Sequence, residues 1–190
     1  VNRRSSGSSS VYIDDVGGSA EATRHLINLG HSRIGHLAGP AGVETSGRRL
    51  EGFGRALVEA GLEVTSAFVV EMKDWSVQSG YTAAKILLSR EDRPTAVFVA
   101  SDDAAIGAMR AAGELQISIP DQLSVIGFHD SDLADFLNPS LTTIRMPLFE
   151  LGQVAAKLLI DRLEGRPTPH ELQVSGKGEL RLRESTAAPL

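Results

Sequence analysis

The residues best suited to chemistry stand together at 129–132, where a histidine, two aspartates and a serine occupy four positions. His129 and Asp130 could form an acid/base pair, as histidine and carboxylate do in hydrolases. The chain has no Gly-x-Ser-x-Gly nucleophile elbow, and its five histidines lack the His-Glu-x-x-His spacing of a zinc site. It also has no cysteine, which excludes thiolate nucleophiles and thiolate metal ligands. We therefore expect a binding protein without a cofactor, and no enzyme.

The polar residues at 129–132 follow a short apolar run, 123–126, and similar runs recur along the chain. They lie at residues 11–13, 33–38, 68–70 and 95–100, and helical patterns separate them. An apolar run without alternation is typical of a strand that is covered on both faces. Strands that alternate with helices predict an α/β fold with a Rossmann-like parallel sheet flanked by helices. Residues 171–174 and 180–183, joined by 175–178, are predicted to form a separate hairpin.

The residues that follow the predicted strands are expected to share one pocket, because open parallel sheets bind ligands at the carboxyl ends of their strands. They are Asp14, the loop 39–47 with Arg49 just after it, Trp75, Ser101, Asp102, His129 and Asp130. One indole, one guanidinium and several short polar side chains suit a sugar.

Other roles remain open for several of these residues. Trp75 could instead be a core or rim aromatic residue, and Arg49 could pair with Glu44 or Glu51. Ser101 and Asp102 could cap the following helix. Of these two, Asp102 is the better candidate for the cap and Ser101 for a ligand contact.

Composition limits the class of partner. The chain has 190 residues, 42% of them hydrophobic and 23% charged, as in an ordinary globular protein. A formal net charge of -5 argues against binding to nucleic acid or to an acidic membrane by this segment itself. No apolar run approaches the length of a membrane span, and no secretory signal opens the chain. The first residue is Val1, and we expect the chain to be part of a longer protein.

Several longer motifs follow one another along nearly the whole chain. They are Gly-His-Ser-Arg-Ile at 30–34, Leu-Ala-Gly-Pro at 37–40, Arg-Leu-Glu-Gly-Phe at 49–53, Pro-Thr-Ala-Val-Phe at 94–98, the stretch 119–130, and Leu-Thr-Thr-Ile at 141–144. This succession resembles the lac repressor family of bacterial transcription regulators. The resemblance implies a type I periplasmic-binding-protein-like fold, in which two Rossmann-like lobes enclose an effector.

On this resemblance, residues 14–144 and 169–190 would form a complete C-terminal lobe that binds effector and dimerises. Residues 1–13 and 145–168 would be a remnant of the N-terminal lobe, with crossovers near Ile13, Thr143 and Pro167. The helix at 148–163 would lack its sheet, and we expect it to be poorly ordered or to rely on a partner chain. The helix-turn-helix head of the family is absent from this chain.

The resemblance also implies roles for single residues. Arg49 would grip effector oxygens, Trp75 would stack on the sugar, and Ser101 and the loop residue Thr45 would contact the ligand. His129 departs from the pattern, because the family has a ligand-binding aspartate there. The departure could mean a different hydroxyl pattern, an anionic effector, or a contact passed to Asp130. Because imidazole titrates near neutrality, it could also make affinity depend on pH.

The function expected from this resemblance is that of a cytoplasmic regulator which senses a sugar or sugar derivative. A homodimer would form through residues 103–112 and the segment near Leu137. Operator DNA would bind only through the missing head, and no membrane would be involved. The alternative is a periplasmic sugar-binding protein of a transporter, which shares the fold; the upstream sequence would decide between the two.

Overall fold

The protein folds around one six-stranded sheet flanked by helices. A computed structural model describes residues 2, 10–174 and 178–190. The sheet has the order β3-β2-β4-β5-β6-β8, and only the last pair, β6 and β8, is antiparallel. Its strands are β2 (Ile34–Ala38), β3 (Val69–Glu71), β4 (Ala96–Val99), β5 (Ser124–His129), β6 (Thr142–Arg145) and β8 (Glu179–Arg181). The predicted fold class is confirmed.

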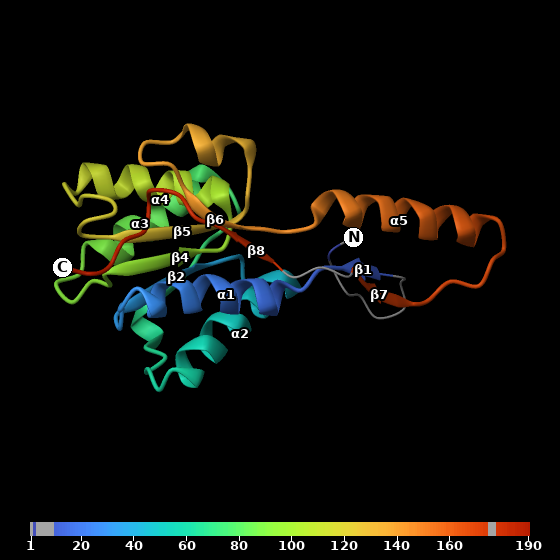
Figure 1. Cartoon of the computed structure of the whole chain (residues 1–190), viewed down its shortest axis with the longest axis horizontal. Helices are drawn as coiled ribbons and strands as arrows, with labels where there is room; N and C mark the ends of the chain where they lie inside the picture. Colours follow the sequence, from blue (N-terminus) through green and yellow to red (C-terminus); the bar gives the residue numbers. More distant parts are fainter. Residues whose placement is uncertain (1, 3–9, 175–177) are drawn as a thin grey trace.

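The middle strands are buried because helices cover both faces of the sheet. Helices α1 (Asp15–Asn28) and α2 (Glu44–Glu59) lie on one face, and α3 (Val77–Leu88) and α4 (Asp102–Glu114) lie on the other (Figure 1). Along β4, Val97 and Val99 pack into the core beneath α3 and α4, whereas Phe98 packs into the core on the opposite face. Every residue of β2 and β4 is buried, which explains why neither strand shows a polar alternation.

Glycines allow the helices of each pair to approach closely. A Cβ at Gly52 of α2 would lie 2.2 Å from the carbonyl oxygen of Val16 in α1. A Cβ at Gly107 of α4 would lie 1.9 Å from the carbonyl oxygen of Val77 in α3. Since no larger residue fits at either contact, Gly107 brings α4 against α3, and Gly52 places the first turn of α1 beside α2, where the candidate site begins.

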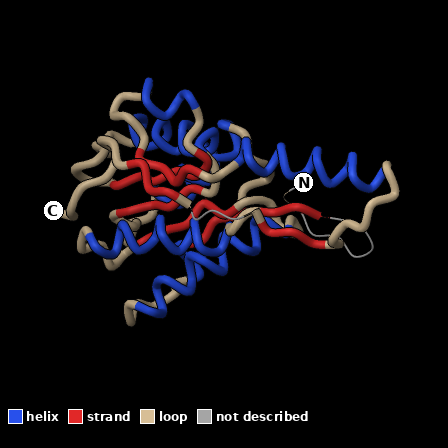
Figure 2. Tube along the Cα trace, turned by 45° about the vertical axis from the view of Figure 1, so that its right-hand side comes forward, coloured by secondary structure: helices blue, strands red, loops and turns tan. Residues whose placement is uncertain are grey.

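A smaller unit extends from one end of the six-stranded sheet (Figure 2). It contains the parallel pair β1 (Ser10–Tyr12) and β7 (Glu171–Gln173) and the helix α5 (Leu148–Leu163). The predicted hairpin is therefore wrong, because β7 pairs with β1 while β8 pairs with β6. Residues 171–173, which were grouped from the sequence with the larger lobe, form β7 and pair with β1. Residues 141–144, expected as a crossover, largely form β6 within the main sheet.

Helix α5 is complete but is covered on one side only. Leu151 is its one buried residue, while Phe149 is 74% exposed and Leu163 is 79% exposed. Leu158 packs partly against the core that contains β1. Much of the apolar surface of α5 thus faces outward in the described part of the chain. Two short 3-10 helices, η1 (Ser66–Phe68) and η2 (Asp132–Phe136), complete the fold.

Candidate functional site

A cavity of about 380 Å³ opens at the carboxyl ends of β2, β4 and β5. Its lining brings together six residues that the sequence predicted: Thr45, Arg49, Trp75, Ser101, Asp102 and His129. Asn2, Asp103 and Ser131 complete the lining and were not predicted as ligand contacts. The polar run 129–132 was a signal for Ser131, but nothing in the sequence pointed to Asn2. The volume suits a small polar molecule.

Arg49 is the most constrained side chain of the cavity, with only 3% of its surface exposed. Its Nε donates to Asp15 Oδ1 at 2.9 Å, and Nη1 donates to the carbonyl oxygen of Ala100 at 2.5 Å. Its Nη2 donates to His129 Nε2 at 2.8 Å. The alternative pairing with Glu44 or Glu51 is wrong, because the ion-pair partner of Arg49 is Asp15, and Glu44 pairs with the neighbouring Arg48.

Asp15 compensates the two buried guanidiniums beside the cavity. It is fully buried, and its second carboxylate oxygen accepts from Arg48 Nη2 at 2.7 Å. Burial lowers the pKa of Arg49, and the charge of Asp15 opposes that shift. Asp14, which was predicted from the sequence to face the ligand, instead caps α1 by accepting from Gly17 N and does not line the cavity. The capping position turns Asp14 toward the helix end, so the next residue faces the arginines.

Trp75 forms one wall and also orients Arg49. The guanidinium carbon of Arg49 lies 5.1 Å from the centre of the Trp75 ring and 4.3 Å from that of Phe128. The indole packs against Gly39, where a Cβ would come within 2.0 Å of Trp75 Cη2. Trp75 is half-buried at the cavity wall. This position is compatible with a stacking platform.

Ser101 and Asp102 have the opposite structural roles to those expected. Ser101 caps α4 by accepting from Ala104 N through its side chain, so the preference for Asp102 as the cap is wrong. The buried carboxylate of Asp102 accepts from Thr143 Oγ1 at 2.7 Å and from Ser131 N at 2.6 Å. Burial raises the pKa of Asp102, and these hydrogen bonds oppose the shift. Asp102 therefore fastens β6 and the segment after β5 to α4.

His129 ends β5 in a backbone conformation that is unusual for a side-chain-bearing residue, with φ at +115°, followed by Asp130 at +59°. Its ring packs edge-on against Phe128. Burial and the charge of Arg49 lower the pKa of His129 to about 3. The imidazole is thus neutral at physiological pH, and the expectation that it titrates near neutrality is wrong.

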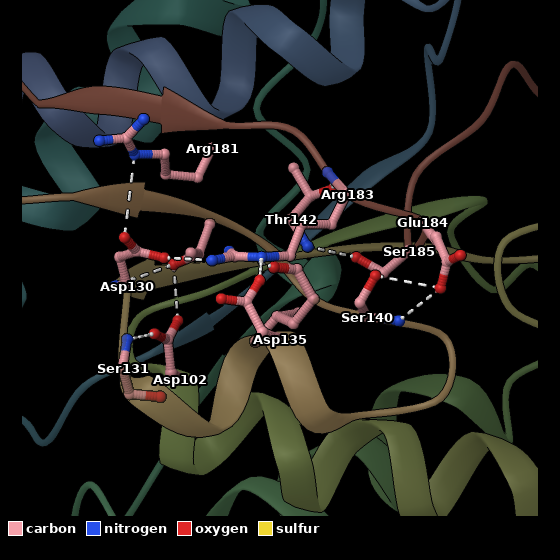
Figure 3. Close-up of polar contacts among 12 residues, drawn as sticks. Asp102, Asp130, Ser131, Asp135, Ser140, Thr142, Arg181, Arg183, Glu184 and Ser185 are labelled. Carbon is pink, nitrogen blue, oxygen red and sulfur yellow. Dashed lines mark hydrogen bonds and ion pairs between the residues drawn. The ribbon is translucent and has the colours of Figure 1, made fainter.

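Asp130 points away from this cavity. Its carboxylate accepts from Arg183 Nη2 at 2.7 Å, and Arg183 also contacts Asp135 and donates to the carbonyl oxygen of Leu141 (Figure 3). Asp130 lines an adjoining cavity of about 680 Å³, together with Arg145 and Glu179. His129 lies between the two cavities and lines both. The carboxylate of Asp130 therefore does not take the place of the expected aspartate in the cavity beside Trp75.

Neither a metal-binding cluster nor a membrane-spanning helix lies within residues 2, 10–174 and 178–190. No group of three or more histidine, aspartate or glutamate side chains in this part of the chain could hold a metal ion. Within the same residues, no helix combines the length and the apolar character that crossing a bilayer requires.

Comparison with known proteins identifies the family of this site. The family described as "Periplasmic binding protein-like domain" matches residues 23–186. The crystal structure of a LacI family transcriptional regulator from Mycobacterium smegmatis superposes with a TM-score of 0.95 at 41% identity, covering 100% of this chain and 70% of that one. The chain belongs to the lac repressor (LacI) family.

Two other transcription regulators show the extent of the match. The transcriptional repressor PurR of Edwardsiella ictaluri is 40% identical over 164 residues, which are 86% of this chain and 48% of PurR. The structure of the transcriptional regulator CelR in complex with cellobiose has a TM-score of 0.90 at 35% identity, and covers 96% of this chain and 57% of CelR. The chain spans about half the length of the curated relatives that it matches.

Proposed function

We propose that this chain is the effector-binding and dimerisation region of a LacI-type transcriptional regulator that senses a sugar or sugar derivative. The observation that carries the proposal is the cavity itself, in which Trp75 presents an aromatic wall beside the guanidinium of Arg49. A sugar has an apolar ring face for the indole and oxygens for the polar groups. The cellobiose bound by CelR supports this class of ligand.

The proposed mechanism is a shift between two arrangements of the lobes. Asn2 lines the cavity, and Asn2 Oδ1 accepts from Ile13 N at 3.2 Å and from Arg48 Nη2 at 3.4 Å. Residues 1–13 and 145–168 would belong to an N-terminal lobe that closes over the ligand. A ligand that binds one arrangement better than the other changes operator affinity through a helix-turn-helix head.

The proposed homodimer would form through residues 103–112 and the segment near Leu137. Next to Leu137, Phe136 is 84% exposed and Leu133 is 54% exposed, so this edge offers apolar side chains to a second copy. The regulator would act in the cytoplasm and would catalyse no reaction. The alternative of a transporter's periplasmic sugar-binding protein has less support, because the matching relatives are transcription regulators.

Calorimetry on the intact protein with glucose, ribose and cellobiose tests the proposal. We expect at least one of the three to bind, and Trp75→Ala to weaken it about tenfold or more because the stacking surface is lost. Trp75→Phe keeps a ring and should weaken binding only a few-fold. Arg90→Ala is the control, since Arg90 pairs with Asp92 on the surface and does not line the cavity.

Two different outcomes would contradict two different parts of the proposal. If none of the three sugars binds the intact protein, the proposal of a sugar effector fails. If one binds with equal affinity to the wild type and to Trp75→Ala, the stacking role of Trp75 fails.

A further inference from the structure

The neighbours of His129 determine which of its ring nitrogens carries the hydrogen. Arg49 Nη2 lies 2.8 Å from His129 Nε2, and a guanidinium can only donate hydrogen bonds. Nε2 must therefore be the acceptor. In a neutral imidazole one nitrogen accepts and the other carries the hydrogen, so the hydrogen resides on Nδ1.

The Nδ1–H group is left for a ligand. In the part of the chain that the structure describes, no group forms a hydrogen bond with Nδ1, and Nδ1 is not among the fully buried atoms that lack a partner. His129 lines the cavity beside Trp75 as well as the adjoining one. Nδ1–H is thus accessible to a ligand at His129, where the two cavities adjoin.

The two buried carboxylates beside the cavity are already occupied by protein donors. Asp15 accepts from Arg48 and Arg49, and Asp102 accepts from Thr143 and Ser131. The remaining carboxylate of the lining, Asp103, is exposed in the first turn of α4. In the cavity beside Trp75, a ligand atom next to His129 therefore meets a hydrogen-bond donor, while the two buried carboxylates nearby already accept from protein groups.

We propose that His129 determines specificity by presenting a fixed N–H donor to the effector. This proposal rests on the proposed function and restricts the effector to a neutral ring compound that directs an acceptor oxygen toward β5. That oxygen is a carbonyl, ring or glycosidic oxygen, or a hydroxyl that accepts. An anion is disfavoured, because Asp15 and Glu44 already balance Arg48 and Arg49, and Asp102 and Asp103 line the same cavity. An aspartate at position 129 would instead select a hydroxyl that donates.

Nitrogen-15 NMR of histidine-labelled intact protein tests the fixed tautomer without any ligand. We expect the His129 signal, assigned by its loss in His129→Asn, to show a protonated Nδ1 and an unprotonated Nε2. Arg49→Met removes the donor to Nε2 and should release this restriction. A wild-type signal with the hydrogen on Nε2 would overturn the inference even if a sugar binds.

The isosteric pair His129→Asn and His129→Asp tests the consequence for the ligand. Asparagine keeps an N–H donor near the position of Nδ1, whereas aspartate offers only acceptors, and both residues tolerate positive φ. The probes are glucose, ribose and cellobiose with their monodeoxy and monodeoxyfluoro analogues, because fluorine on carbon accepts a hydrogen bond but cannot donate one. Binding is measured by calorimetry.

The expected pattern is specific to one ligand position. In the wild type and in His129→Asn, fluorine at that position should be tolerated, whereas deoxygenation should weaken binding by about tenfold. In His129→Asp the fluoro analogue should lose about tenfold as well. If sugars bind but His129→Asp shows the wild-type pattern, the inference fails and the proposed function stands. If none of the three sugars binds, both fail.

Discussion

Two arginine clusters lie on either side of the turn at His129 and Asp130, and they differ in burial. Arg49 is held by Asp15, the carbonyl of Ala100 and His129, and its side chain is 3% exposed. Arg183 is held by Asp130 and Asp135, but Asp135 is 68% exposed. The same ion-pair chemistry therefore has different consequences. The buried cluster organises the cavity, whereas the outer cluster ties the chain after β8 to the turn.

The largest expected effect is in the buried cluster, where Asp15→Asn removes the carboxylate that Arg48 and Arg49 share. Removing one partner of a buried ion pair leaves uncompensated charge, so the free energy of unfolding should fall by about 3–5 kcal/mol. Denaturant unfolding measures this change. The matched control is Asp92→Asn, which breaks an exposed pair with Arg90 and should leave the free energy of unfolding nearly unchanged. Equal losses of unfolding free energy in Asp15→Asn and Asp92→Asn would contradict the expectation that the buried ion pair contributes more than the exposed one.

Stability should also fall in acid because of histidines buried in neutral form. His36 is stacked between Phe53 and Phe98, and burial lowers its pKa to about 4. Since the unfolded state takes up the proton first, stability is full above pH 6.5 and declines as pH falls toward 4, by roughly 3 kcal/mol. Chemical unfolding at several pH values checks this decline. His36→Leu should remove the share of His36 and leave the share of His129, so the decline becomes shallower, whereas substitution of the exposed His170 by glutamine should leave the decline unchanged.

A smaller effect is expected in the outer cluster from Arg183→Met. Asp130 would lose its 2.7 Å partner, but this carboxylate is close to solvent and to Arg181, so the loss of stability should be about 1–2 kcal/mol. Effector affinity should change no more than a few-fold, because Arg183 touches the turn and not the cavity lining. Denaturant unfolding and calorimetry measure the two quantities. A loss of stability as large as that of Asp15→Asn would remove the distinction between the clusters.

Several parts of the fold and site could be predicted because they follow from local patterns. Unalternating apolar runs predicted the strands of a doubly covered sheet, and β2 and β4 are fully buried as that pattern requires. The gathering of Arg49, Trp75, Ser101 and His129 followed from one rule, that parallel strands end at the same edge. These predictions needed no knowledge of side-chain direction.

The wrong predictions concern features that depend on the direction of a side chain or on the pairing of strands far apart in the sequence. Asp14 and Asp15 are adjacent and chemically identical, and only the start of α1 determines that the first caps the helix while the second meets the arginines. Likewise, β7 is a run of three residues whose partner, β1, lies far away in the sequence. No local pattern distinguishes that pairing from a hairpin with β8.

The sequence by itself determined the family, the alternation of strands and helices, and the residue types that meet at the strand ends, because these depend on periodicity and order. Only the tertiary structure decided what the unusual His129 does. Its neutral form and the position of its hydrogen depend on burial and on a 2.8 Å contact with a residue 80 positions away. A protonation state follows from the surroundings of a group in three dimensions, and residue order does not contain those surroundings.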